Sequence, residues 1–250
     1  MPVKMNQNHR DRYARQIRLE QFGESGQQKI LDSSALIIGM GGLGSPAAMY
    51  LAASGIGKLV ISDYDMVEVS NLQRQIIHAD KSIGENKVDS AKATIEALNP
   101  ECEVETIAYQ LDEDELKSTV EGVDIVLDCS DNFPTRFEVN RNCVETETPL
   151  VSGAAIRLEG QIMNYQPNVQ GPCYQCLYTQ VYENAETCEM EGVLGPVVGV
   201  IGTMQALQTL LILTDQGEPM IGRLLLFDAA SMEWQGVKLP KNPHCPVCGE

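Results

Sequence analysis

The sequence has far fewer basic than acidic residues. It also has no uninterrupted hydrophobic run of membrane-spanning length, no internal repeat and no low-complexity tract. Its 18 Lys and Arg stand against 35 Asp and Glu, and this net charge of −17 argues against a nucleic-acid binder that neutralises phosphates. The longest apolar stretch, Val193 to Leu213, is interrupted by glycines, Pro196 and two glutamines. It therefore predicts a buried core helix that starts near Pro196, not a membrane span.

The N-terminal segment also lacks the apolar core of a signal peptide. We therefore expect a cytoplasmic protein whose cysteines are reduced, metal-bound or reactive. Residues 1–18 hold five basic residues and one acid, a net +4, so the other 232 residues carry −21. This basic arm is either a solvated tail or a device that places an arginine on a phosphate in a neighbouring subunit.

The stretch from Ala35 to Asp63 has the pattern of a nucleotide-binding unit. An apolar run enters the glycine turn Gly39–Gly44, a helix pattern follows over Pro46–Ser54, and a second apolar run ends at Asp63. In such units the glycines let the backbone approach phosphates, and the acid accepts a ribose hydroxyl. The alternatives are a tight turn without a ligand, and an Asp63 that caps a turn.

Strand and helix patterns alternate along the chain. Besides the nucleotide unit, we expect helices over 1–30, 88–98 and 112–121, and strands over 104–108, 125–127, from 150, over 162–165 and over 224–227. The pattern predicts an α/β protein with a Rossmann-like, doubly wound, mostly parallel sheet and an antiparallel C-terminal part. We expect a single domain over 1–250, with a helical arm (1–30), a nucleotide-binding half (31–150) and a second half (151–250).

Three charged residues are candidates for phosphate chemistry. The segment Ser70–Gln75 is polar and carries Arg74, which can hold phosphate oxygens in a fork, and Lys87 can add a point charge. Asp131 follows a strand end, where open α/β sheets bind ligands, and could carry Mg²⁺. The alternative for Lys87 is a surface lysine at the start of a helix.

Two Cys-x-x-Cys pairs, Cys173/Cys176 and Cys245/Cys248, can together form a closed four-sulfur zinc site that pins the C-terminus to the middle of the chain. The alternative is a pair of redox dithiols. Cys188 lies in an acidic segment, 182–191, that we expect to be an exposed loop. Nearby negative charge disfavours the thiolate, so a chemical role would need a partner or substrate that supplies positive charge.

Taken together, these motifs resemble the MoeB/ThiF/HesA family, bacterial relatives of ubiquitin-activating enzymes. The resemblance runs from about Arg12 to Gly249 and is closest to the molybdopterin-synthase adenylyltransferase branch, with the thiamine-pathway branch close behind. It rests on Arg12–Ile17, Gly39–Gly44, Ser70–Gln75, Lys87, Asp128–Asn132, Val151–Ala155, Gly160-Gln161, Gly192–Pro196 and the cysteine pairs.

The resemblance implies a reaction and its residues. Such enzymes use MgATP to adenylate the C-terminal Gly-Gly carboxylate of a ubiquitin-like sulfur carrier, with release of pyrophosphate. The residues expected at the nucleotide are Gly41, Gly42, Gly44, Asp63, Ser70, Asn71, Gln73, Arg74, Lys87, Asp131 and Asn132. Asp131 would hold Mg²⁺, Arg15 would reach the phosphates from the partner of a homodimer, and the four paired cysteines would bind Zn²⁺. Cys188 matches the family's loop cysteine, which either links covalently to the carrier or is dispensable.

A sulfurtransferase or cysteine desulfurase is a further candidate partner for the adenylated carrier.

The residues also leave three alternative functions open. An NAD-dependent oxidoreductase would share the glycine turn and Asp63, but it would leave Arg15, Arg74 and Lys87 without a task. A non-enzymatic carrier-binding scaffold would keep the fold and lose the chemistry. A third possibility keeps adenylation and changes the acceptor.

Overall fold

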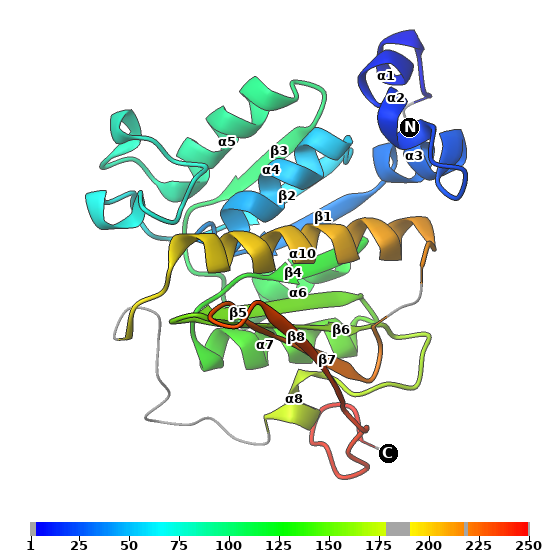
Figure 1. The fold of residues 1–250 in the computed structure, drawn as a ribbon, viewed down its shortest axis with the longest axis vertical. Helices are drawn as coiled ribbons and strands as arrows, with labels where there is room; N and C mark the ends of the chain where they lie inside the picture. The colour runs from blue at the N-terminus through cyan, green and yellow to red at the C-terminus, as the bar shows by residue number, and fades with distance from the viewer. Residues whose placement is uncertain (1–3, 179–190, 218–219, 250) are drawn as a thin grey trace.

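The computed structural model describes residues 4–178, 191–217 and 220–249, and its centre is one eight-stranded sheet (Figure 1). Its strand order is β3-β2-β1-β4-β5-β6-β7-β8; neighbours from β3 to β5 are parallel, and those from β5 to β8 are antiparallel. The predicted doubly wound sheet with an antiparallel C-terminal part is confirmed. The strands are β1 (Ser34–Ile38), β2 (Lys58–Ser62), β3 (Glu103–Ile107), β4 (Ile125–Asp128), β5 (Leu150–Ile156), β6 (Glu159–Tyr165), β7 (Arg223–Asp228) and β8 (Glu233–Lys238).

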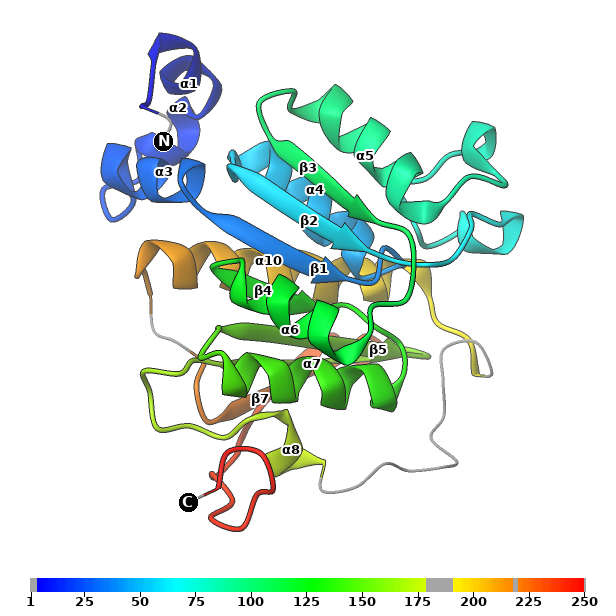
Figure 2. The same cartoon turned by 180° about the vertical axis from the view of Figure 1, so that it is seen from behind.

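Helices cover both faces of the parallel part of the sheet. The helices α4 (Gly44–Ser54), α5 (Lys87–Leu98) and α10 (Gly195–Thr214) lie on one face, and α6 (Glu113–Glu121) and α7 (Phe133–Glu145) lie on the other (Figures 1 and 2). The side chains of β1 point alternately to the two faces of the sheet and pack in both hydrophobic layers. Ile37 packs in the layer with α4, α5 and α10, and Leu36 and Ile38 pack in the layer with α6 and α7. Parallel strands buried on both faces explain the continuous apolar runs of the sequence.

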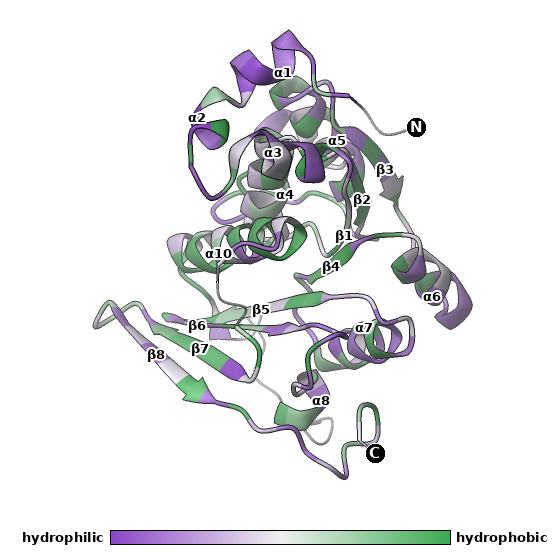
Figure 3. Cartoon of the chain, turned by 90° about the vertical axis from the view of Figure 1, so that its right-hand side faces the viewer, coloured by the Kyte–Doolittle hydropathy of each residue, from purple (hydrophilic) through white to green (hydrophobic). Residues whose placement is uncertain are grey.

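The long apolar helix α10 is a core element, as predicted. Among the described residues it is the one helix that is long and apolar enough to cross a membrane. Half of its most apolar stretch, 50%, is buried inside the protein. Figure 3 looks nearly along the axis of α10 and shows mainly hydrophobic residues in its turns. Its residues Val197, Ile201 and Ala206 join the core. It packs closely on α4, because a Cβ at Gly202 would lie 2.2 Å from the carbonyl oxygen of Leu43.

The N-terminal arm is helical, but it is broken into three short helices, α1 (Gln7–Arg12), α2 (Ala14–Ile17) and α3 (Gly23–Leu31). Gly23 opens α3 with a φ of +59°, a left-handed value that favours glycine. The arm is tied to the body through Tyr13, whose hydroxyl accepts a hydrogen bond from Asn99 Nδ2 at 3.0 Å. The remaining short helices are η1 (Val69–Asn71), η2 (Asp80–Ser82) and α8 (Tyr174–Leu177).

Candidate functional site

A cleft of about 1680 Å³ opens at the carboxyl ends of the parallel strands. The chain leaves β1 toward α4 on one face and leaves β4 toward α7 on the other, so the two connections diverge and leave a crevice between them. The cleft brings together ten of the residues predicted at the nucleotide. These are Gly41, Gly42, Asp63, Ser70, Asn71, Gln73, Arg74, Lys87, Asp131 and Asn132.

The glycine turn lies against the end of β4 and leads directly into α4. Gly39 has a φ of +94°, and a Cβ there would lie 2.7 Å from the carbonyl oxygen of Cys129. Gly44 is the predicted residue that does not line the cleft, because it packs against the backbone of Gly39 as the first residue of α4. No side chain of a described residue caps the start of α4, which leaves its first N–H groups suited to an anion.

Asp63 holds the glycine turn from the side of β2. Its Oδ2 accepts the N–H of Met40 at 2.7 Å, and its Oδ1 accepts the N–H of Asp65 at 2.9 Å. Burial raises the pKa of Asp63, and the nearby Lys87 cation and these two N–H groups oppose the shift. Asp63 is therefore a turn cap in this structure, and it also lies at the wall of the cleft.

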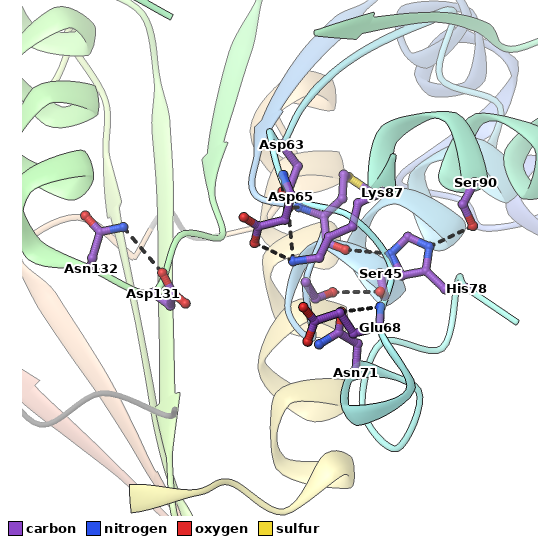
Figure 4. A network of polar contacts seen from close by, with 12 residues as sticks. Ser45, Asp63, Asp65, Glu68, Asn71, His78, Lys87, Ser90, Asp131 and Asn132 are labelled. Carbon is purple, nitrogen blue, oxygen red and sulfur yellow. Dashed lines mark hydrogen bonds and ion pairs between the residues drawn. The ribbon is translucent and has the colours of Figure 1, made fainter. Parts of the chain in front are cut away.

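Lys87 is buried at the first position of α5, so the reading of a surface lysine is wrong. Its Nζ lies 2.7 Å from Asp65 Oδ2 and 3.9 Å from Asp63 Oδ2 (Figure 4). The two carboxylates hold the buried ammonium in a fixed position. Asp65 was not predicted from the sequence, although two acids at this spacing, Asp63 and Asp65, directly follow a strand.

The polar segment after β2 folds on itself around η1. The Oδ1 of Asn71 accepts the N–H of Glu68 at 3.1 Å, and the Nη1 of Arg74 donates to the carbonyl oxygen of Ser70 at 3.0 Å. Arg74 remains half-buried at the edge of the cleft. The contacts hold the backbone of the segment, while the guanidinium keeps further N–H groups for a ligand.

Asp131 lies exposed in the turn between β4 and α7, opposite Lys87 across the cleft (Figure 4). Asn132 caps α7, since its Oδ1 accepts the N–H of Thr135 at 3.0 Å, and its Nδ2 donates to Asp131 Oδ1 at 3.3 Å. Below this turn the buried Asp128 accepts hydrogen bonds from the backbone and hydroxyl of Ser130 and from Ser152 Oγ. The exposed carboxylate therefore rests on a fixed, buried support.

The opposite wall of the cleft comes from the second half of the chain. It is formed by small residues of β5 and β6 and by two aromatic side chains, Tyr174, the first residue of α8, and Tyr178, which directly follows α8. The Tyr178 hydroxyl and the Gln161 side chain hydrogen-bond at 3.0–3.1 Å. Neither tyrosine was predicted from the sequence, although Tyr174 directly follows Cys173 and Tyr178 lies two residues after Cys176.

The two cysteine pairs meet in one cluster. All four sulfur atoms lie within 4.8 Å of one another, with 3.7 Å between Cys173 and Cys245 and 3.4 Å between Cys176 and Cys248. A tetrahedral zinc site with Zn–S bonds of about 2.3 Å requires sulfur separations of about 3.8 Å. Asn140 Nδ2 donates to Cys173 Sγ at 3.5 Å, and such a hydrogen bond orients a ligand. The donor set and its spacing fit zinc.

Arg15 is a further predicted site residue that does not line the cleft of its own chain. Arg15 is exposed on α2, in the arm near the amino ends of the strands, and it is not among the described residues that line the cleft (Figure 2). Cys188 lies outside the described residues.

The sequence matches a known protein family and several curated proteins. The model of the ThiF family matches residues 13–247. The molybdopterin-synthase adenylyltransferase of Salmonella typhimurium is 42% identical over 239 residues, which cover 96% of each protein. The SAMP-activating enzyme E1 of Haloferax volcanii is 43% identical and covers 100% of this chain and 93% of that protein. The ThiS adenylyltransferase of Escherichia coli is 44% identical and covers 97% of both.

The fold is also that of a solved protein. A crystal structure of MccB from Escherichia coli with succinimide superposes with a TM-score of 0.85 at 24% identity, covering 99% of this chain and 75% of that one. At this identity the likeness concerns the fold.

Proposed function

The chain belongs to the ThiF family, and from that membership we propose that it is an adenylyltransferase for a ubiquitin-like sulfur-carrier protein. The substrates are MgATP and the C-terminal Gly-Gly carboxylate of the carrier. The products are the acyl-adenylate of the carrier and pyrophosphate. Relatives that are 42–44% identical over nearly the whole chain carry adenylyltransferase names, which supports the proposal.

The observation that carries the proposal is the meeting of Arg74, Lys87 and Asp131 with the glycine turn in one cleft. A triphosphate needs cations, and a metal between its phosphates needs a carboxylate. We place the ribose at Asp63, and the phosphates between the start of α4 and the side chains of Ser70, Asn71, Gln73, Arg74 and Lys87. Mg²⁺ bound at Asp131 would neutralise charge between the phosphates.

The chemistry needs positioning more than acid–base groups. A carboxylate oxygen of the carrier attacks the α-phosphorus, and the bond from that phosphorus to the bridging oxygen breaks as pyrophosphate leaves with the electron pair. No general base is required, because a C-terminal carboxyl group is ionised at neutral pH. Arg74 and Lys87 neutralise the charge that develops on the phosphates, and the cleft holds the two anions in contact.

The second half of the chain, 151–250, would receive the carrier tail. The cleft volume exceeds the roughly 300–1,000 Å³ of ordinary small-molecule pockets, which leaves room for a peptide end beside a nucleotide. Small residues of β5 and β6, with Tyr178 opposite, suit a tail without side chains. Zn²⁺ held by Cys173, Cys176, Cys245 and Cys248 would be structural, because four thiolates leave no open position.

A homodimer would complete the site. Arg15 lies outside the cleft of its own chain, so in this proposal it reaches the phosphates of the partner subunit. Exposed apolar side chains on α10 and α4, such as Val200, Leu207 and Tyr50, support a contact between two copies. The reading of the basic arm as a solvated tail would leave these observations unconnected.

The carrier belongs to molybdopterin or thiamine biosynthesis in this proposal, as the names of the relatives suggest. A sulfurtransferase or cysteine desulfurase would then deliver sulfur to the acyl-adenylate. We place the enzyme in the cytoplasm. Cys188 would either link to the carrier or be dispensable, and mass spectrometry of the enzyme with carrier and MgATP distinguishes the two.

The test is ATP–pyrophosphate exchange with purified carriers of the two pathways. We expect exchange that depends on the carrier tail, and a loss of at least about 100-fold in Arg74→Ala and in Asp131→Asn. Arg141→Ala is the matched control, because Arg141 is a half-buried arginine of α7, like Arg74 in exposure, that pairs with Glu113 away from the cleft.

Two results would contradict the proposal. A fluorescence titration in which NADH binds tightly while ATP does not would favour the oxidoreductase. Unchanged biological function in folded Arg74→Ala and Asp131→Asn variants would favour a carrier-binding scaffold.

A further inference from the structure

A buried imidazole lies directly behind the glycine turn. His78 Nε2 is 3.1 Å from the carbonyl oxygen of Met40, and its Nδ1 is 2.9 Å from Ser90 Oγ (Figure 4). His78, Met40 and Ser90 are all buried. His78 is not among the residues that line the cleft, so it has no direct contact with a ligand there.

These contacts fix the form of the ring. The carbonyl oxygen of Met40 can only accept a hydrogen bond, so Nε2 must carry a proton. A neutral ring then accepts the hydroxyl proton of Ser90 at Nδ1. Burial and the nearby Lys87 cation lower the pKa of His78, which favours this neutral form, although the Met40 carbonyl acts in the opposite direction.

The peptide groups of Met40 are therefore held from both sides. Asp63 Oδ2 accepts its N–H at 2.7 Å, and His78 donates to its carbonyl oxygen. Met40 is the second residue of the glycine turn, between Gly39 and Gly41. Fixing both ends of this residue sets the direction in which the turn presents its backbone to the cleft.

The same imidazole connects the turn to Lys87. Ser90 lies in the first turn of α5, three residues after Lys87. The Lys87 ammonium nitrogen lies 3.9 Å from Asp63 Oδ2. The connection closes a ring from Asp63 through Met40, His78 and Ser90 along the first turn of α5 to Lys87. The backbone of the turn and the lysine that we place at the phosphates thus share one set of supports.

We propose that His78 is a positioning residue of the nucleotide site. Its hydrogen bonds to Met40 and Ser90 fix the position of the glycine turn relative to Lys87. The inference rests on the proposed function for the identity of the ligand, MgATP. It concerns a residue that touches neither nucleotide nor carrier.

The test compares nucleotide affinity in the full-length protein with stability. His78→Phe keeps a ring and removes both hydrogen bonds, and we expect the Kd for MgATP, measured by calorimetry, to rise about tenfold, the effect of about one lost hydrogen bond. His78→Gln can donate to Met40 and accept from Ser90, so it should recover most of the affinity. Ser90→Ala removes one link and should raise the Kd about threefold.

Thr94→Val is the matched control. Thr94 is also on α5, is half-buried, and its Oγ1 donates to the carbonyl oxygen of Ile77, directly before His78, at 2.8 Å. The variant loosens the same segment without touching the ring or Met40. We expect a lower thermal midpoint with the Kd for MgATP within about twofold of wild type, whereas a merely structural His78 would make the two variants behave alike.

The outcomes separate this inference from the proposed function. An unchanged Kd in His78→Phe, or an equal rise in Thr94→Val, overturns the inference alone. If His78→Phe does not fold, an unchanged Kd in Ser90→Ala overturns it. A wild-type protein that binds MgATP but exchanges no pyrophosphate with any carrier ends the proposed function, and the Kd comparison still decides the role of His78. A wild-type protein that binds no nucleotide overturns both.

Discussion

Asp128 ends β4 with a side chain that is only 1% exposed, directly below the turn that carries Asp131. Its Oδ1 accepts the backbone N–H of Ser130 at 3.1 Å and the hydroxyl at 2.6 Å, and its Oδ2 accepts Ser152 Oγ at 2.9 Å. Burial opposes a high pKa of the buried Arg136, but the nearby negative charge of Asp128 raises this pKa. One carboxylate therefore accepts three hydrogen bonds and adds a negative charge near a buried cation.

Removing this carboxylate should destabilise the protein strongly. We expect Asp128→Ala to lower the free energy of unfolding by about 3–5 kcal/mol, because it leaves the buried donors of Ser130 and Ser152 without their acceptor. It also removes the negative charge near the buried Arg136 guanidinium, which keeps its hydrogen bond to the Ser130 carbonyl oxygen. Asp128→Asn keeps an acceptor and should lose about half as much. Urea denaturation followed by circular dichroism measures the difference.

The matched control is Asp124→Ala, at an exposed carboxylate that also accepts a backbone N–H and a hydroxyl, both from Ser34. Water can replace these bonds, so we expect a loss of about 1 kcal/mol. Equal losses in the two variants would show that burial of Asp128 does not set its contribution.

At the residue scale, the residues of the site could be predicted from the sequence better than the side chains that they contact. Arg74, Lys87 and Asp131 were expected at one nucleotide from the family resemblance, and Asp131 also because it follows a strand end, where open α/β sheets bind ligands. The ion pair of Lys87 with Asp65 and the contacts of His78 depend on how the connection between β2 and α5 folds. No periodic pattern specifies that path, so those partners could not be read from the sequence.

At the scale of elements, α10 packs closely against the start of α4 near the site. A Cβ at Gly202 would lie 2.2 Å from the carbonyl oxygen of Leu43, the residue that precedes α4. Gly199, one turn earlier on α10, has no atom within 4 Å of such a Cβ. The same substitution at the two glycines therefore meets opposite surroundings.

Gly202→Ala should push α10 away from the start of α4. We expect a loss of about 2–4 kcal/mol in the free energy of unfolding and a weaker affinity for MgATP, since the glycine turn rests on this contact. Gly199→Ala should be neutral or stabilise by up to about 1 kcal/mol, because alanine favours a helix over glycine. Denaturation curves and calorimetry give both quantities, and a stable Gly202→Ala variant would contradict the packing argument.

Elements with a strong pattern were predicted closely. The apolar run 35–38 became β1 over Ser34–Ile38, and the expected helix at 112–121 became α6 over Glu113–Glu121. The strand β8 was missed, because every one of its residues is exposed and no apolar alternation marks it. The arm was expected as one helical stretch over 1–30, but turns at Tyr13 and before Gly23 divide it.

At the scale of the whole molecule, the cysteine cluster joins the C-terminal segment after β8 to α8 beside the cleft. Removing the metal with a chelator, or replacing Cys245 by Ser, should release this segment. We expect a loss of at least about 3 kcal/mol in the free energy of unfolding, because metal binding stabilises the folded state. The KM for the carrier should rise as the wall of Tyr174 and Tyr178 loosens, while the Kd for MgATP stays within about twofold.

Metal analysis by plasma mass spectrometry should give one Zn²⁺ per chain in the wild type. Cys102→Ala is the control, since Cys102 is buried but lies outside the cluster. It should keep its zinc and its KM for the carrier. A wild-type protein without zinc, or a chelated protein with an unchanged thermal midpoint, would contradict a structural metal at this place.

The placement of Arg15 outside the cleft of its own chain makes the proposed dimer testable by mixing two inactive proteins. If each site uses Arg74 from one subunit and Arg15 from its partner, Arg15→Ala and Arg74→Ala should each lose pyrophosphate exchange. In a mixed dimer, one site keeps both arginines and the other lacks both. Random reassociation makes about half of the dimers mixed, so about a quarter of the wild-type activity should return.

Mixing Arg15→Ala with itself through the same unfolding and refolding steps is the control and should restore nothing. If Arg15 served its own chain, a mixed dimer would hold no complete site, and the mixture would stay inactive. If the arm were a solvated tail, Arg15→Ala alone would keep full activity. The recovered activity thus decides which subunit supplies the arginine, and its dependence on protein concentration reports the dimer itself, because dilution below the dissociation constant would abolish it.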